Sequence, residues 1–112
     1  MERFVVWSIL CLFIADADAD MSKAELLGAT AGRVLGAAHT CGIPPERLQA
    51  TARLTFAAID QVAKSDQDRT SANDRMRDAL TLGREDIDAQ RTSCQAARSA
   101  LGRLEKRVTK RP

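Results

Sequence analysis

In residues 22–64, and again from residue 73 to residue 109, apolar side chains recur every three or four positions, a spacing that places them along one face of an α-helix. No run in this region shows the strand signals of alternating or β-branched-rich sequence. Helices are predicted over about residues 22–41, 45–64 and 72–109. The expected fold class is therefore all-α, a small antiparallel bundle of three to four helices with one disulfide.

The first two helices have recognisable ends. Ser22 and Glu25 have the spacing of a capping box, in which each side chain satisfies a free backbone N–H at a helix start. Gly42 is a typical C-terminal stop, and Pro45 suits the first position of a new helix. Because the connection between them is short, these two helices are expected to be antiparallel neighbours.

The third helical segment is too long for its partners. A continuous helix over 72–109 would span about 57 Å, against about 30 Å for each of the others. Either a break occurs near Leu82-Gly83, which gives four helices, or the long helix extends beyond the other two and packs against a second subunit. Residues 65–71 contain no large apolar side chain and are predicted to form a polar turn. The apolar seam repeats every seven residues, at Leu80, Ile87, Cys94, Leu101 and Val108.

The N-terminus has the composition of a secretory signal. An apolar run of about 11 residues ends abruptly at alternating Ala and Asp, so a signal peptidase could cut after Ala17 or Ala19. An uncleaved anchor or a true start at Met21 are the alternatives. Residues 1–19 are predicted to be a cleaved signal peptide and 20–112 a single exported domain, with no transmembrane span after cleavage. The abundant alanine and arginine fit a GC-rich bacterial genome and favour the periplasm over the extracellular space.

Removing the signal leaves few large apolar side chains. The mature 93 residues contain sixteen alanines and only eighteen larger apolar residues besides cysteine, with Phe56 as the single aromatic. They carry sixteen Lys and Arg against twelve Asp and Glu, a net charge of +4. The core is therefore expected to be thin, and its stability to depend on a covalent link.

Two cysteines remain in the mature chain, Cys41 and Cys94. In an oxidising compartment they are predicted to form one disulfide, against the alternatives of two buried thiols or an intermolecular bridge. Closing a loop of this length stabilises the fold by about 4 kcal/mol. A zinc site is not expected, because His39 is the only histidine.

Three glycines, Gly28, Gly32 and Gly36, fall at four-residue intervals on the first predicted helix. They form a smooth ridge that allows another helix to approach closely. That helix belongs either to the same chain or to a homodimer or other partner.

The C-terminal end is basic. Residues 98–112 have a net charge of +5, whereas residues 20–97 sum to −1. Cations at a helix C-terminus complement its dipole. The alternative is contact with an anionic partner, which outside the cytoplasm means acidic lipid headgroups, anionic envelope polymers or an acidic protein. Nucleic acid is not expected, since residues 98–112 contain no aromatic residue for base stacking. The candidate contact residues are Arg103, Lys106, Arg107, Lys110 and Arg111.

No catalytic, cofactor-binding or metal-binding residues are predicted. The sequence has no tyrosine, no glycine-rich phosphate loop and no nucleophile elbow. The aspartates at 66 and 68 start like a calcium loop, but the glycine and glutamate that such a loop needs are missing. Glu85, Asp86 and Asp88 are expected to form local ion pairs with Arg84 and Arg91.

The sequence thus predicts a small exported, disulfide-stabilised helical protein, not an enzyme, that acts by binding itself, another envelope protein or an anionic envelope surface. In general layout, the chain is similar to small acid-stress chaperones of the periplasm, which are also helical and held by one disulfide. That resemblance does not extend to a local motif around Cys41 or Cys94. It implies the alternative function, a chaperone that loosens at low pH. An enzyme inhibitor or a hydrolase is the residual hypothesis.

Overall fold

The computed structural model describes residues 21–110, and this part of the chain is all-helical, with no strand. The four helices are α2 (Lys23–Thr40), α3 (Pro45–Val62), α4 (Asp66–Asp88) and α5 (Cys94–Thr109). The predicted all-α fold class is confirmed. The predicted signal peptide, residues 1–19, lies outside the described residues, as does Arg111.

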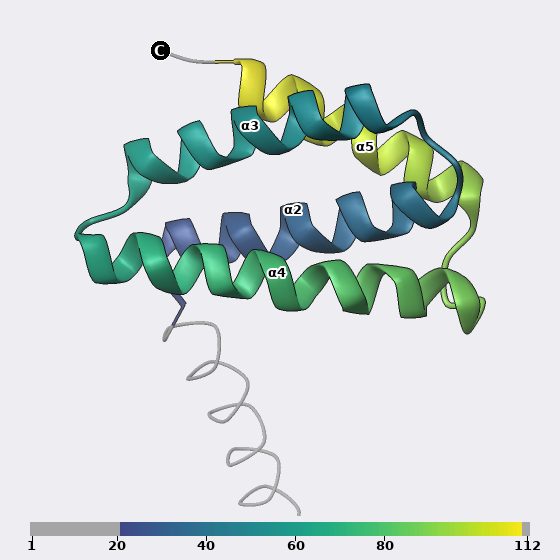
Figure 1. Cartoon of the computed structure of the whole chain (residues 1–112), viewed down its shortest axis with the longest axis horizontal. Helices are drawn as coiled ribbons and strands as arrows, with labels where there is room; N and C mark the ends of the chain where they lie inside the picture. The colour runs from purple at the N-terminus through teal and green to yellow at the C-terminus, as the bar shows by residue number, and fades with distance from the viewer. Residues whose placement is uncertain (1–20, 111–112) are drawn as a thin grey trace, which may run out of the picture.

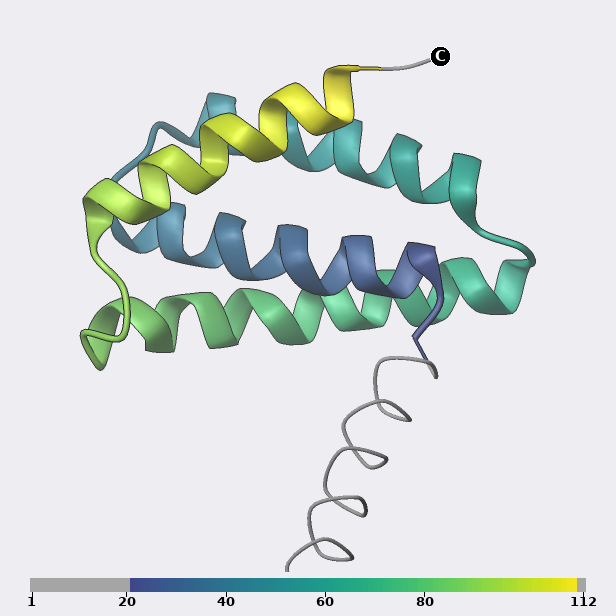
Figure 2. The ribbon, with the colours of Figure 1, turned by 180° about the vertical axis from the view of Figure 1, so that it is seen from behind.

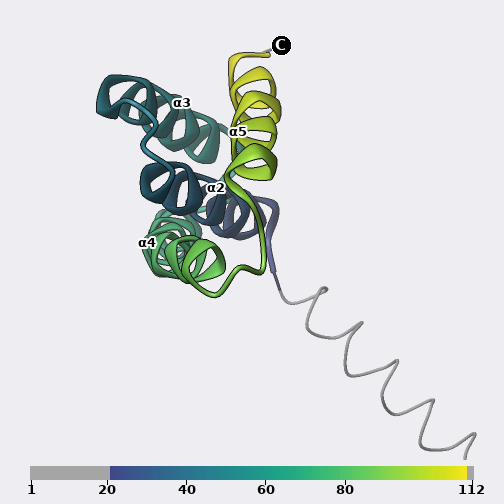
Figure 3. The ribbon, with the colours of Figure 1, turned by 90° about the vertical axis from the view of Figure 1, so that its right-hand side faces the viewer.

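Helix α2 is the centre of the bundle. It packs against all three other helices, most extensively against α4 (Figure 3). Seen end-on, α4 lies on one side of α2, while α3 and α5 lie on the other. Consecutive helices run in opposite directions, as predicted, so α2 and α4 are parallel to each other (Figure 1). All four helices contribute side chains to the core, and α2 lies at its centre.

The ends of α2 and the start of α3 follow the sequence signals. The Glu25 N–H donates to Ser22 Oγ (3.1 Å), and the Ser22 N–H donates to Glu25 Oε1 (3.2 Å), which completes the capping box. Gly42 follows α2 with φ of 79°, a left-handed conformation that favours glycine. Pro45 is the first residue of α3. These three predictions are confirmed.

The polar turn predicted at residues 65–71 is wrong, because α4 begins at Asp66. Ser65 caps this helix by accepting a hydrogen bond from the Asp68 N–H (3.1 Å). Acidic side chains in the first turn suit the positive end of the helix dipole. This first turn of α4 is largely exposed to solvent, so it needs no apolar residue. The lack of an apolar residue therefore does not indicate that the segment is outside a helix.

The continuous helix predicted over 72–109 and the break near Leu82-Gly83 are also wrong. The chain breaks at residues 89–93, between α4 and α5. Gln90 has φ of 58°, and the Arg91 N–H donates back to the Asp86 carbonyl (2.8 Å), which turns the chain. The Ser93 hydroxyl then caps α5 by accepting from the Ala96 N–H (3.1 Å). The seven-residue seam is therefore divided between two antiparallel helices.

The core is thin, as the composition predicts. Its cluster combines four alanines with nine larger side chains, and two buried threonines of α3 donate their hydroxyls to carbonyls of their own helix. Within residues 21–110, none of the helices has the length and apolar character needed to cross a membrane. The larger core residues are Leu27, Leu35, Ile43, Leu48, Ile59, Met76, Leu101, Leu104 and Val108.

Candidate binding groove

The disulfide joins Cys41 to Cys94 and confirms the predicted pairing. Their Cα atoms are 5.5 Å apart. Cys41 directly follows α2, and Cys94 is the first residue of α5. The bond therefore holds the start of α5 beside the end of the central helix, just after the break that the sequence does not locate.

The glycine ridge of α2 packs against α4 of the same chain. A Cβ atom added to Gly28, Gly32 or Gly36 would collide with the backbone carbonyl of Ala72, Met76 or Leu80, respectively. Gly83 of α4 makes the reciprocal approach, since its Cβ would collide with the Arg33 carbonyl of α2. The backbones of the two parallel helices are thus in direct contact, and Gly83 serves this contact instead of ending a helix.

This close pairing leaves a groove between α3 and α4, with α2 as its floor. Helices α3 and α4 contact each other far less than either contacts α2. The space between them has a volume of about 390 Å³. Most of its lining is apolar, which is the usual character of a binding site. The apolar side chains come from all three helices and are Leu35, Leu48, Ala52, Phe56, Met76 and Leu80.

The rim of this α3/α4 groove is basic. His39, Arg77 and Arg84 contribute to the lining, and no acidic side chain does. Arg84 forms no ion pair among the described residues, and Arg77 reaches only Asp74, at 3.9 Å. Phe56 lies at the groove with 43% of its surface exposed. An exposed aromatic ring beside Arg84 and the loosely paired Arg77 is a surface suited to an apolar partner with negative charges.

Asn73 adds an unsatisfied polar atom to the groove wall. Its Oδ1 is buried and has no hydrogen-bond partner within the described part of the chain. Buried polar atoms normally have partners. This oxygen is shielded from solvent, so it does not itself face the open groove.

Asp86 is a nearly buried carboxylate that pairs with two arginines. It is only 7% exposed and accepts hydrogen bonds from Arg33 of α2, through Nε and Nη2 (3.0 Å for the latter), and from Arg91 Nε (2.9 Å). These guanidinium hydrogen bonds hold the pKa of Asp86 far below its usual range. The pair with Arg91 was expected from the sequence, but the pair with Arg33 was not. Neither Glu85 nor Asp88 forms an ion pair in residues 21–110.

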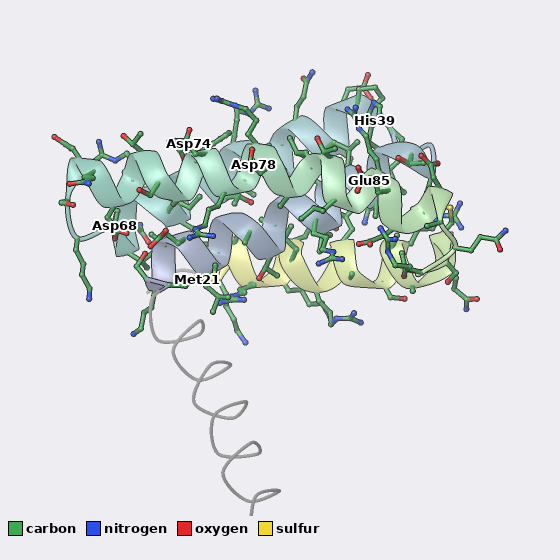
Figure 4. The ribbon with its side chains drawn as sticks, turned by 90° about the horizontal axis from the view of Figure 1, so that it is seen from below. Met21, His39, Asp68, Asp74, Asp78 and Glu85 are labelled. Carbon is green, nitrogen blue, oxygen red and sulfur yellow. A yellow bond between two sulfur atoms is a disulfide. The ribbon has the colours of Figure 1, made fainter. Side chains whose placement is uncertain are left out.

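Two more carboxylates bind the opposite end of α4 to α2. Glu25 accepts from Arg75 Nε (2.8 Å), which lowers the Glu25 pKa. The Ser22 hydroxyl donates to Asp68 Oδ1 (2.6 Å), and this bond lowers the Asp68 pKa. Figure 4 shows Asp68 and Met21 at the same end of the bundle, where α4 and α2 begin. Acidic residues thus attach α4 to α2 at both ends.

A fourth carboxylate links α3 and α5. Arg47 donates to both carboxylate oxygens of Glu105, at 2.9 and 2.7 Å. This bidentate pair lowers the pKa of Glu105 and raises the pKa of Arg47. Glu105 is the single acidic residue of the basic C-terminal end, so its charge is already neutralised.

The structure separates the predicted basic residues. Arg103, Lys106, Arg107 and Lys110 are all exposed on α5 or at its end, and none forms an ion pair within residues 21–110. Arg107 and Lys110 border a second apolar hollow together with Lys23 of α2, whereas Arg103 and Lys106 do not. None of these residues lies at the α3/α4 groove.

The groove itself was missed by the sequence analysis. Leu48, Ala52 and Phe56 lie at four-residue intervals on α3 and form a second apolar stripe beside the core stripe. The width of this apolar face is the sequence feature from which a binding groove could have been predicted. Across residues 21–110, no three His, Cys, Asp or Glu side chains cluster in a way that could hold a metal ion. The groove offers apolar contacts on its floor and the guanidinium groups of Arg77 and Arg84 in its lining. No protein-family model, curated protein or solved structure matches the chain.

Proposed function

We propose that this is an exported, disulfide-stabilised binding protein whose α3/α4 groove holds an amphipathic helix of a partner protein. The observation that carries the proposal is the combination of an apolar groove floor, an exposed Phe56 and a rim with cations but no acidic side chain. Export is supported by the signal-like N-terminal sequence and by the disulfide, which is typical of oxidising compartments.

A helix fits the shape and chemistry of the groove. The groove runs between two helices and is open to solvent, so an incoming helix can lay its apolar face on the floor. Acidic residues flanking that face would lie opposite Arg77 and Arg84. An exposed apolar surface beside a central aromatic residue is also where binding energy concentrates in protein interfaces.

Site-specific photocrosslinking tests the proposal in the native cell. A photoreactive phenylalanine analogue replaces Phe56, and in a control protein it replaces Arg98, which is exposed on α5 away from the groove. We expect illumination to give one discrete larger species from position 56 and none from position 98. The absence of a species from position 56, or identical products from both positions, would refute groove binding. A product with twice the mass of the mature chain would show self-association instead.

Charge reversal uses the same crosslink to test whether the partner is acidic. The double variant Arg77→Glu/Arg84→Glu should lower the crosslink yield at position 56 by about tenfold or more, because like charges would face the acidic partner. The matched control, Arg53→Glu/Arg98→Glu, reverses two exposed arginines outside the groove. Equal yields from the two variants would contradict an acidic partner.

An acid-stress chaperone is the second candidate, and one observation favours it. The side-chain hydrogen bonds that attach α4 to α2 all involve carboxylates: Glu25, Asp68 and Asp86. Protonating them would weaken both ends of this attachment and expose apolar surface on α2. Circular dichroism from pH 7 to pH 2, combined with a client-aggregation assay, tests this function. A fully structured protein at pH 2 that does not protect its client would exclude it.

A further inference from the structure

A second apolar hollow lies at the end of the molecule where α2 begins and α3 and α5 end. Its volume is about 580 Å³. Seen from behind, the last turns of α5 rise away from the start of α2 at this end (Figure 2). The hollow is separate from the α3/α4 groove and shares no lining residue with it. Its apolar lining is Leu26, Leu27, Ala58, Val62 and Val108.

Two of these side chains project into solvent. Leu26 is 52% exposed and Val62 is 40% exposed. They come from different helices, α2 and α3, and both line the same hollow. Leaving both exposed is unfavourable in water, so this end has the character of an interaction surface.

The charged residues around this hollow are all cations. Lys23, Arg107 and Lys110 line it, without any acidic side chain, and none forms an ion pair within the described residues. Two acidic residues near the start of α2 and α4 have other partners. Glu25 forms an ion pair with Arg75, and Asp68 accepts a hydrogen bond from Ser22. The described residues that line the hollow therefore carry an uncompensated charge of +3.

Helix stability does not account for all three cations. Arg107 is in the last turn of α5, and Lys110 follows as its C-cap, where positive charge is favourable. Lys23, in contrast, is the first residue of α2, where the helix dipole disfavours a cation. A ligand with negative charge would explain why a lysine stands at this position.

We propose that this end of the bundle docks on an anionic lipid bilayer. Leu26 and Val62 enter the headgroup region, while Lys23, Arg107 and Lys110 contact lipid phosphates. Cations surrounding a small apolar projection are the arrangement used by proteins that lie on membranes. Met21, the first residue that the structure describes, is also at this end (Figure 4). The proposal is independent of what binds in the α3/α4 groove.

Cosedimentation of the mature chain with vesicles tests the docking. We expect binding to vesicles that contain phosphatidylglycerol, weakening as salt is raised, and little binding to phosphatidylcholine vesicles. Each cation near an anionic surface contributes roughly fivefold in affinity, so Lys23→Gln/Arg107→Gln/Lys110→Gln should bind on the order of 100-fold more weakly. Equal binding to both vesicle types would overturn the proposal.

A matched control removes the same charge from other surfaces. Arg53→Gln/Arg98→Gln/Arg103→Gln has the same net charge as the triple variant, and these exposed arginines lie outside both the hollow and the α3/α4 groove. It should keep most of the vesicle binding. A loss equal to that of the first variant would show attraction by net charge alone and would contradict a defined docking end.

The apolar contribution is tested separately. Leu26→Ser/Val62→Ser changes two exposed side chains, so the fold should persist, as circular dichroism would verify. We expect it to reduce vesicle binding by about tenfold. Unchanged binding would mean that Leu26 and Val62 do not enter the headgroup region, and it would contradict this mode of docking. Inorganic phosphate, compared with chloride at matched ionic strength, should not displace the wild-type chain from vesicles.

Discussion

Asp86 of α4 accepts hydrogen bonds from Arg33 of α2, a residue 53 positions earlier in the chain. The carboxylate is nearly buried, whereas the guanidinium is about half exposed. The pair lies next to the point where Gly83 meets the Arg33 carbonyl. A single residue of α2 thus contacts α4 through both its backbone and its side chain.

Replacing Asp86 should measure how much this contact stabilises the fold. Asp86→Asn keeps the shape but removes the charge that two arginines share, so the free energy of unfolding should fall by about 2 kcal/mol. Urea denaturation followed by circular dichroism measures the change. Asp78→Asn, on the exposed face of α4 (Figure 4), is the control and should change stability by less than about 0.5 kcal/mol. Equal effects of the two variants would show that the ion pair is not structural.

The glycine contacts predict opposite effects for two alanine substitutions. Gly32→Ala places a Cβ against the Met76 carbonyl and should destabilise the fold by about 2 kcal/mol, as overpacking does. Gly102→Ala meets nothing within 4 Å, so it should stabilise α5 by about 0.5 to 1 kcal/mol. Melting temperatures of the two variants give the comparison. A Gly32→Ala protein as stable as wild type would contradict the close approach of α2 and α4.

Removing the disulfide should be more damaging than either substitution. Cys41→Ser/Cys94→Ser frees a loop whose ends are 53 positions apart and should lower the free energy of unfolding by about 4 kcal/mol. For a core this thin, that is a large share of the typical total of about 5 to 15 kcal/mol. Urea denaturation of the variant beside the oxidised wild type measures the loss. A difference below about 1 kcal/mol would show that the core alone sustains the fold.

Acid should weaken the fold through its paired carboxylates. The pKa values of Glu25, Asp68, Asp86 and Glu105 are lowered by their donors, so each group stabilises the folded state above its unfolded pKa. This stabilisation is lost as the pH falls through the folded pKa values, so the decline starts below about pH 4. Urea midpoints measured from about pH 7 to pH 2.5 should fall over this range, and less steeply in Asp86→Asn. A constant midpoint would contradict the ion-pair assignments.

Much of the fold follows from the sequence because its signals are local. Capping by Ser22, the stop at Gly42 and the start at Pro45 each depend on residues a few positions apart. The Cys41–Cys94 pairing follows because only two cysteines remain after the predicted signal. The start of α4 and the break after Asp88 were missed, because a helix turn exposed to solvent needs no apolar residue and Gly83 serves packing.

The groove and the long-range ion pairs depend on information that one helix does not contain. Whether Phe56 faces Met76 across a groove is set by how α3 and α4 are rotated about α2. Arg33 and Asp86 likewise meet only because the glycine contacts fix α2 parallel to α4. The sequence suggested basic residues as a binding feature, but only the arrangement of helices shows which of them adjoin apolar surface.

Mass-spectrometric mapping of the photocrosslink formed from position 56 identifies what the α3/α4 groove binds. We predict that the crosslinked peptide comes from another protein and belongs to an amphipathic helix with acidic residues beside its apolar face. A crosslinked peptide from a second copy of this chain, or one without acidic residues, would contradict it.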